Sequence, residues 1–288
     1  MHSKAKTIEP MDIGGRRFEW DRRTYVMGVL NVTPDSFSGD GLGSDVQDAV
    51  DRGLRFEEWG ADILDVGGES TRPPSVYAGA RPTSADDELR RVLPVLERLS
   101  GRVSVPLSID TYKARVASEA LAAGASMIND VWGLRRDPEM AGLAADRGVP
   151  VVLMHNQERG GYGDVVADVI KSLSDAIEKA VYAGVSRDKI IVDPGFGFGG
   201  KSPAHNLEII RRLREFESLE RPLLMGTSRK STIGRVLDLP VEERLEGTAA
   251  TVVLSIVGGA DIVRVHDVKE MARISRMTDA LVRGWDGP

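Results

Sequence analysis

Side chains that can bind a charged, hydrogen-bonding ligand recur in this sequence where short apolar runs end. Asp110, Asn129 and Asp193 each end such a run, and carboxylates and amides suit a flat ring that carries several N–H donors and acceptors on its edge. Lys230 and Arg264 lie just after or within two further runs, and cations of this kind suit a phosphate or diphosphate. Together these residues predict one ligand that combines a donor-rich ring with an anionic tail.

Each of these residues also has a simpler explanation, because Asp and Asn often cap the helix that follows them. Capping explains one such position well, but it explains a whole series of them poorly. The apolar runs end at Asn31, Asp65, Asp110, Asn129-Asp130, His155, Asp193, Thr227 and residues 264–267. We therefore interpret the set as the lining of a single site.

The runs themselves are typical of strands buried on both faces, because they are rich in Val, Ile and Leu and do not alternate with polar residues. They cover residues 25–31, 62–66, 105–110, 126–129, 150–155, 189–193, 222–227 and 261–266. Amphipathic helical patterns lie between them, for example at 85–99, 112–123, 165–183, 205–216 and 242–257. Strand–helix units repeated in this way predict an α/β fold, a (β/α)8 TIM barrel, whose usual length is about 250 residues.

No Pro- or Ser-rich linker divides the chain, so a single barrel domain is expected over residues 25–288. Residues 1–24 form a short N-terminal extension, in which Gly14-Gly15 predicts a hairpin-like turn that closes the bottom of the barrel. A doubly wound open sheet is the structural alternative, because it is built from the same units.

The composition excludes several classes of protein. The chain of 288 residues contains no Cys, which rules out disulfides, thiolate metal sites and cysteine nucleophiles. Its net charge of -6 argues against a nucleic-acid partner. It contains no apolar run of about 18 residues and no apolar segment near its start, which argues against a membrane span and a secretory signal. We therefore expect a cytoplasmic protein that binds small molecules.

Longer motifs around these residues resemble the signatures of the dihydropteroate synthase family. They are MGVLNVTPDSFS at 27–38, GGESTRP at 67–73, SIDT at 108–111, IND at 128–130, DPGFGFG at 193–199, GTSRKS at 226–231 and RVHD at 264–267. The motifs follow family order over almost the whole chain and coincide with the strand ends. The resemblance implies a synthase that condenses 6-hydroxymethyl-7,8-dihydropterin diphosphate with 4-aminobenzoate, forming 7,8-dihydropteroate for folate biosynthesis and releasing diphosphate.

The resemblance also implies roles for single side chains around the pterin. The residues expected to contact it are Asp110, Asn129, Met154, Asp193, Phe198 and Lys230. Asp110, Asp193 and Lys230 are expected to be the catalytic members of this set. Asp193 should face the guanidine-like edge of the pterin, because a carboxylate accepts hydrogen bonds from such a donor pair well.

A second group of residues is implied for the diphosphate. Arg72, Arg264 and His266 should bind it, and Asn31 should help to hold Mg²⁺ against it. Diphosphate is expected to leave first, because the metal and the cations stabilise its charge. The arylamine then attacks the pterin methylene carbon, and no general base stands out for this step.

The 4-aminobenzoate should lie nearer the surface. Its carboxylate is expected to meet Ser231 and the start of the helix there, and loops that carry Phe37 and Thr71 should close over it. Gly39 and the long segment 74–80 depart from the family spacing beside this pocket. Neutral loop variation explains the departures simply, whereas a reshaped pocket predicts a sulfonamide-insensitive variant.

Residues 195–202, GFGFGGKS, also match the phosphate-binding P-loop pattern. A nucleotide hydrolase is therefore an alternative, although the match depends on an additional Gly200, and Pro203 indicates a later helix start. A pterin-binding methyltransferase and a non-catalytic relative are two further alternatives. The four cations Arg72, Lys230, Arg264 and His266 favour the synthase.

A homodimer is the expected assembly, because synthases of this family commonly pair through their last helices. The segments 249–257 and 271–282 have apolar faces that suit such an interface. Packing of these helices on the barrel explains the same faces equally well.

Overall fold

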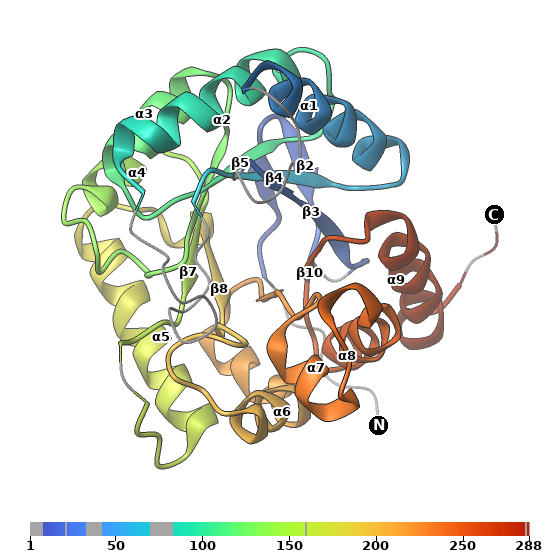
Figure 1. Ribbon diagram of the computed structural model, residues 1–288. Helices are drawn as coiled ribbons and strands as arrows, with labels where there is room; N and C mark the ends of the chain where they lie inside the picture. Colours follow the sequence, from blue (N-terminus) through green and yellow to red (C-terminus); the bar gives the residue numbers. More distant parts are fainter. Residues whose placement is uncertain are drawn as a thin grey trace.

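The computed structural model describes residues 8–20, 22–32, 42–69, 83–158, 160–285 and 287, with the backbone alone for 42–45. The parallel strands stand in the order β8-β7-β6-β5-β4-β3-β10-β9, and a parallel bridge between Val192 and Leu223 joins the two ends of this sheet. Helices surround the closed sheet (Figure 1). The predicted (β/α)8 barrel is therefore confirmed, and the open doubly wound sheet is wrong because the sheet closes on itself.

The barrel strands are β3 (Tyr25–Asn31), β4 (Ile63–Gly67), β5 (Leu107–Asp110), β6 (Met127–Asp130), β7 (Val151–Met154), β8 (Ile190–Asp193), β9 (Leu224–Met225) and β10 (Ile262–Val265). The described α-helices are α1 (Leu42–Glu58), α2 (Ala85–Leu99), α3 (Ala114–Ala122), α4 (Met140–Arg147), α5 (Val165–Tyr182), α6 (Pro203–Arg211), α7 (Ser231–Leu237), α8 (Leu245–Val257) and α9 (Val268–Arg283). Short 3-10 turns cover η2 (Arg187–Lys189), η3 (Leu213–Leu219) and η4 (Val241–Glu243).

Several predicted elements are shorter or shifted in the structure, and two of them are instructive. The helix expected at 205–216 begins at Pro203, ends at Arg211 and continues as η3. It begins early because Ser202 caps it together with His205 in a capping box, with Pro203 in the first turn. The strand expected at 222–227 shrinks to Leu224–Met225. At its start the N–H of Leu223 donates to the carboxylate of Asp261 rather than to a neighbouring strand.

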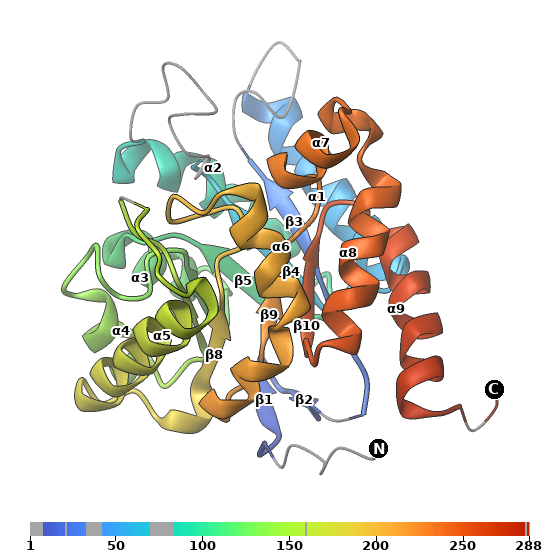
Figure 2. The same ribbon diagram turned by 90° about the horizontal axis from the view of Figure 1, so that it is seen from below.

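The hairpin predicted in the N-terminal extension is present and fills the lower end of the barrel (Figure 2). Strands β1 (Met11–Ile13) and β2 (Arg16–Phe18) pair antiparallel around Gly14-Gly15, both of which adopt positive φ. Side chains of the hairpin belong to one apolar cluster with residues from inside the barrel. That cluster contains Met11, Ile13, Phe18, Trp20, Tyr25, Met27, Ile63, Met127, Val152, Ile191, Leu224 and Ile262. Apolar side chains therefore fill the interior of the barrel at the amino ends of its strands.

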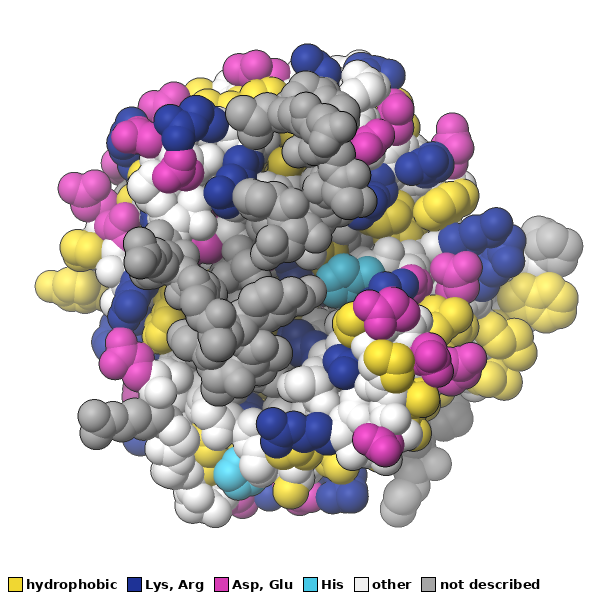
Figure 3. All heavy atoms as spheres, viewed as in Figure 1, with side chains coloured by type: hydrophobic (Ala, Val, Ile, Leu, Met, Phe, Trp, Pro, Cys, Tyr) yellow, Lys and Arg dark blue, Asp and Glu magenta, His cyan; other side chains and the backbone are white. Residues whose placement is uncertain are grey.

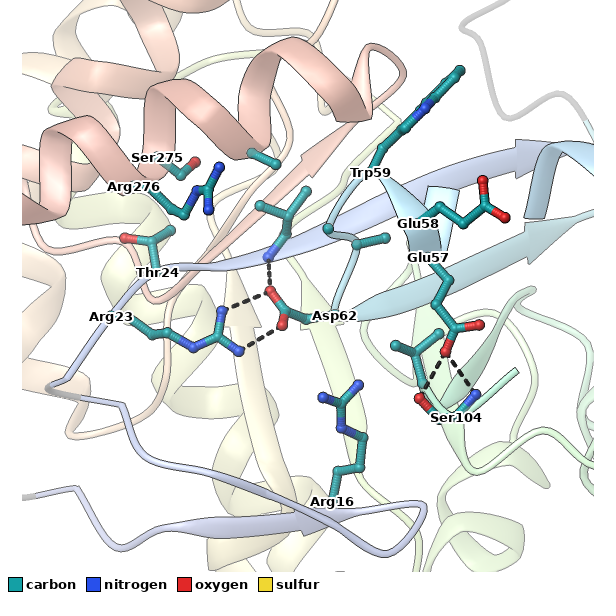
Figure 4. A pocket seen from close by; sticks show the side chains of 15 residues that line it. Arg16, Arg23, Thr24, Glu57, Glu58, Trp59, Asp62, Ser104, Ser275 and Arg276 are labelled. Carbon is teal, nitrogen blue, oxygen red and sulfur yellow. Dashed lines mark hydrogen bonds and ion pairs between the residues drawn. The ribbon is translucent and has the colours of Figure 1, made fainter. Parts of the chain in front are cut away.

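A hollow of about 450 Å³ lies outside this end of the barrel, beside the amino ends of β3 and β4 (Figure 4). Three of its charged side chains have partners within the protein. Arg23 donates to both carboxylate oxygens of Asp62, at 3.1 and 2.6 Å, and Glu57 accepts from the backbone and hydroxyl of Ser104, both at 2.7 Å. None of the predicted site residues lines this hollow.

None of the helices in the described part of the chain is both long and apolar enough to cross a membrane.

Candidate active site

The carboxyl ends of the strands meet at the other end of the barrel, which faces the viewer in Figures 1 and 3. Strand register brings the predicted residues together there. Asp110 on β5 lies directly opposite Asn129 on β6, and Met154 at the end of β7 lies opposite Asp193 on β8. The two pairs consist of buried side chains.

A chain of charged and amide groups crosses this end of the barrel. Arg264 on β10 donates through Nε to Asp65 and through a terminal nitrogen to Asp110, each at 2.6 Å. Asn129 Nδ2 donates to the same oxygen of Asp65, at 3.0 Å. Residues 199 positions apart in the sequence, Asp65 and Arg264, therefore form one network.

The network is incomplete on its acidic side. Asp65 and Asp110 each have a second carboxylate oxygen, Oδ1, that is buried and has no hydrogen-bond partner among the described residues. Leaving a buried acceptor unpaired costs about 1–3 kcal/mol. Two such oxygens in one network indicate that a ligand with N–H donors completes it.

Burial also shifts the titration of Asp110. It raises the pKa of that carboxyl to about 7, the nearby Asp65 acts in the same direction, and Arg264 opposes both. The same guanidinium is held by the two carboxylates, which raise the pKa of Arg264 above its ordinary value despite burial. Near neutral pH Asp110 therefore exchanges between a charged acceptor and a neutral acid.

A second cluster lies on the loop that follows β8. Asp193 accepts a hydrogen bond from the backbone N–H of Gly195 at 2.7 Å. Lys230 donates to the carbonyl oxygen of Phe196, and its Nζ lies 4.1 Å from the centre of the Phe198 ring. Burial lowers the pKa of Lys230 to about 7, opposed by the negative charge of Asp193. Asp193 and Lys230 are therefore near enough for the charge of each to act on the other.

The remaining predicted residues surround these clusters. His266 follows β10, and both its backbone N–H and its Nδ1 lie within 3.2 Å of the Ser228 hydroxyl oxygen. When that hydroxyl donates to Nδ1, the neutral ring carries its hydrogen on Nε2. Ser231 is exposed at the first position of α7. Phe37, Thr71 and Arg72 lie outside the described residues.

Of the loop departures noted in the sequence, Gly39 and residues 74–80 also lie outside the described ranges. Gly200 is described and exposed, and its φ of 68° is left-handed. A glycine adopts that conformation without the steric cost that a side chain would add.

The donor set at this end of the barrel suits a cation bound mainly by its substrate. Among the described residues, no three His, Asp or Glu side chains gather to hold a metal ion. The half-buried amide of Asn31 ends β3 at this same rim. Mg²⁺ keeps several waters and takes few protein ligands when phosphate oxygens are present, so the fit is to an ion that binds together with a diphosphate.

The P-loop interpretation of residues 195–202 is wrong. In a P-loop the lysine reaches toward bound phosphates, whereas Lys201 is 9% exposed and its ammonium bonds to the loop's own carbonyl oxygens. The helix α6 begins only at Pro203, so the N–H groups of a helix start are not presented by the glycines.

The sequence analysis assigned no individual role to three residues that the structure places in contact with the site. Asp65 and His155 were visible only as strand ends, and Lys201 only as part of a motif for a different ligand. Strand-end position was thus a usable signal for two of them, while the partners of all three depend on distances that the sequence does not contain.

Comparison with known proteins now gives the family. The family of pterin binding enzymes matches residues 27–266. Over 263 residues the chain is 51% identical to the dihydropteroate synthase of Bacillus subtilis (strain 168), covering 91% of this chain and 90% of that one. The chain belongs to the dihydropteroate synthase family.

Solved dihydropteroate synthases share the fold as well. The Clostridium difficile enzyme, in the presence of pteroic acid, is 48% identical with a TM-score of 0.88, covering 92% of this chain and 99% of that one. The Xanthomonas albilineans enzyme in complex with 7,8-dihydropteroate is 42% identical with a TM-score of 0.86, covering 95% and 98%. The chain is therefore a transferase of folate biosynthesis that condenses the pterin diphosphate with 4-aminobenzoate.

Proposed function

We propose that the condensation takes place at the carboxyl end of the barrel, with the pterin held by the two acidic clusters described above. The observation that carries this placement is the pair of buried oxygens on Asp65 and Asp110 that have no partner among the described residues. A pterin presents several N–H groups on one edge, and each can pair an acceptor that is otherwise costly to bury. The Xanthomonas albilineans enzyme has been solved with 4-aminobenzoic acid, which supports the second substrate.

In this proposal Asp193 accepts hydrogen bonds from the guanidine-like edge of the pterin, and Asp110 and Asn129 contact the rest of the ring. Asp193 suits the role because it is buried at the end of β8. Met154 and Phe198 supply apolar surface on either side. Lys230 adds a donor next to Asp193, and its lowered pKa lets the lysine lose its proton near neutral pH.

The diphosphate meets the cations on the opposite side of the pterin. Arg264 uses two N–H groups on Asp65 and Asp110, and its guanidinium carries five in all, so donors remain for an anion. His266 and the sequence-predicted Arg72 add to them. Asn31 would ligate Mg²⁺, which when bound supplies positive charge to the leaving diphosphate.

Bond breaking precedes bond making in this mechanism. The bond from the pterin methylene carbon to the diphosphate oxygen breaks, and the electron pair leaves with diphosphate, where Arg264 and His266 stabilise it. The amine of 4-aminobenzoate then attacks that carbon and loses one proton to water. Ser231, Thr71 and Phe37 are proposed to hold the aminobenzoate in line for this step.

The test is direct. Purified protein, pterin diphosphate, 4-aminobenzoate and Mg²⁺ should yield dihydropteroate and diphosphate in equal amounts, measured by chromatography and by a coupled diphosphate assay. A matched reaction with Arg264→Met should form little dihydropteroate and release little diphosphate. Product formation that is equal in the variant would contradict the proposed diphosphate site.

We further propose a homodimer, formed by α8 and α9, in the cytoplasm. Leu254, Met277 and Leu281 are 55%, 60% and 73% exposed on these helices, and Figure 3 shows hydrophobic side chains gathered on this side of the molecule. Apolar side chains in such a group mark an interaction surface. Light scattering should give twice the chain mass, and Leu281→Glu should give the monomer mass.

Reduced sulfonamide sensitivity is a separate proposal that rests on the altered spacing at Gly39 and 74–80. The protein should bind sulfamethoxazole weakly compared with 4-aminobenzoate, so that sulfamethoxazole inhibits it poorly. A variant with 74–80 shortened to the usual family length should regain sensitivity, and potent inhibition of the unaltered protein would contradict the proposal.

A further inference from the structure

A buried lysine that the mechanism above does not use lies directly behind the pterin-facing loop. Lys201 is 9% exposed, and its Nζ lies 2.8 Å from His155 Nδ1, 3.1 Å from the carbonyl oxygen of Gly195 and 3.1 Å from that of Phe198. An ammonium group has three N–H donors. The three acceptors therefore satisfy it fully within the protein, and it has no spare donor for a ligand.

The loop folds closely around this ammonium group. Gly195 and Gly199 have φ of 70° and 68°, a conformation that favours glycine. A Cβ on Gly195 would lie 2.0 Å from the carbonyl oxygen of His155, and one on Gly199 would lie 2.8 Å from the hydroxyl oxygen of Tyr162 and 3.2 Å from Lys201 Nζ. Tyr162 also donates to the carbonyl oxygen of Gly199, at 2.6 Å. The glycines thus let the backbone approach the lysine from two sides.

The same loop is held from the substrate side by a second lysine. Lys230 donates to the carbonyl oxygen of Phe196, and a Cβ on Gly197 would lie 2.8 Å from Lys230 Cδ. Two ammonium groups therefore bind alternating carbonyl oxygens of one short loop, Lys201 at Gly195 and Phe198 and Lys230 at Phe196. Displacement of the loop at either lysine moves the contacts of the other.

We infer that Lys201 is a positioning residue for the pterin site, which ties the loop after β8 to His155 at the end of β7 and so fixes where Lys230 and Phe198 stand. The inference rests on the proposed function, because it is the pterin-facing side of this loop that Lys201 orders. Lys201 itself touches neither substrate.

The pKa values of His155 and Lys201 agree with this geometry. Burial lowers the pKa of His155 to about 3, and the positive charge of Lys201 acts in the same direction. The imidazole is therefore neutral at pH 7, and its Nδ1 accepts when Lys201 carries its proton. Burial lowers the pKa of Lys201 to about 7, with Asp193 opposing the shift and Lys230 and Arg135 adding to it.

The inference is tested with Lys201→Met, which keeps an apolar stem and removes the ammonium group. The matched control is Lys171→Met on α5, where the lysine is exposed and pairs with Asp175 at the surface. We expect Lys201→Met to raise the KM for pterin diphosphate about tenfold, as for the loss of a charge-assisted hydrogen bond, while the KM for 4-aminobenzoate changes by less than about twofold. Lys171→Met should match the unaltered protein in both.

Two further readouts separate positioning from general loss of structure. The affinity of Lys201→Met for 6-hydroxymethylpterin, measured by calorimetry, should fall as its KM for pterin diphosphate rises. The ¹⁵N resonances of His155 should show its pKa rising when the neighbouring cation is removed. Where Lys201→Met does not fold, His155→Leu, which deletes one acceptor, should give a smaller rise in the pterin KM.

The outcomes separate the inference from the proposed function. A folded Lys201→Met or His155→Leu protein with unchanged pterin KM and affinity overturns the inference alone. If the unaltered protein and Lys171→Met both make no dihydropteroate, the proposed function fails and the inference falls with it. Equal rises in both KM values indicate a merely structural lysine and also overturn the inference.

Discussion

The two ends of this barrel contain similar residues in opposite states. At the amino end Arg23 and Asp62 satisfy one another in two hydrogen bonds, and apolar side chains of the hairpin pack into the interior of the barrel. At the carboxyl end Arg264 is shared between Asp65 and Asp110, and each acid keeps a buried oxygen without a described partner. The acid of the first end is paired with its cation within the protein, while the acids of the second end keep acceptors that a ligand can pair. The comparison predicts that mutations at the amino end act on stability and those at the carboxyl end on activity.

The largest expected effect is on stability, at the amino end. Phe18 is 2% exposed, and its ring centre lies 4.5 Å from that of Tyr25 and 5.7 Å from that of Trp20. Phe18→Ala should lower the free energy of unfolding by about 3–5 kcal/mol, because it leaves a cavity in this cluster. Chemical denaturation measures this, and kcat/KM below the unfolding range should stay close to that of the unaltered protein. A large loss of kcat/KM in the folded variant would break the comparison.

The next effect is on ligand binding. Asp193→Asn keeps the shape of the side chain but replaces the charged acceptor, so pterin affinity should fall about 100-fold. The midpoint of thermal unfolding should not fall, because the substitution removes a buried charge whose pKa burial raises. Calorimetry with 6-hydroxymethylpterin checks the first point and differential scanning calorimetry the second. Unchanged pterin affinity would refute the role of Asp193.

A third prediction concerns pH. The folded-state pKa of Asp110 is raised to about 7 from 3.8, so the group's contribution to stability is full below pH 4 and is lost as the pH rises toward 7. Asp110→Asn cannot lose a proton there, so its stability relative to the unaltered protein should increase as the pH rises from 4 to 7, by at most about 1.4 kcal/mol per pH unit. Urea unfolding at several pH values tests this, and a pH-independent difference would contradict it.

The smallest effect is expected at the paired charges of the amino end. Arg23→Met leaves Asp62 without its cation, but the arginine side chain is 48% exposed, so water screens the loss. A decrease of about 1 kcal/mol in the free energy of unfolding is expected, with kcat/KM unchanged. Urea unfolding and the dihydropteroate assay together provide the check. A tenfold decrease in kcat/KM would show that the two ends are coupled.

The sequence predicted the barrel well because its signals are local. The apolar run at 25–31 and the amphipathic pattern at 85–99 match β3 and α2 residue for residue. The strand at 222–227 could not be bounded, because its end depends on a hydrogen bond to Asp261 from the neighbouring unit. Local patterns thus fix element type, while contacts from other units fix element length.

The position of the candidate site could be predicted from the sequence, but the hydrogen bonds and ion pairs within it could not. That Asp110, Asp193, Lys230 and Arg264 gather at one rim follows from strand polarity alone. That Asp65 shares Arg264 with Asp110 depends on the curvature of the closed sheet. The contacts of Lys201 with backbone carbonyl oxygens leave no trace in the sequence, its side-chain partner His155 lies far away along the chain, and its motif pointed to another ligand.

The hairpin beneath the barrel affects the order in which substrates bind at the other end. Phe18 and its neighbours fill the barrel interior at the amino end, so the place where the ring is proposed to lie is closed on that side by described residues. The substrate that binds deepest would then bind before the substrate that covers it. The product would leave by the same route through which the two substrates entered. A cluster of apolar side chains far from any reacting atom would in this way determine the order in which the substrates bind.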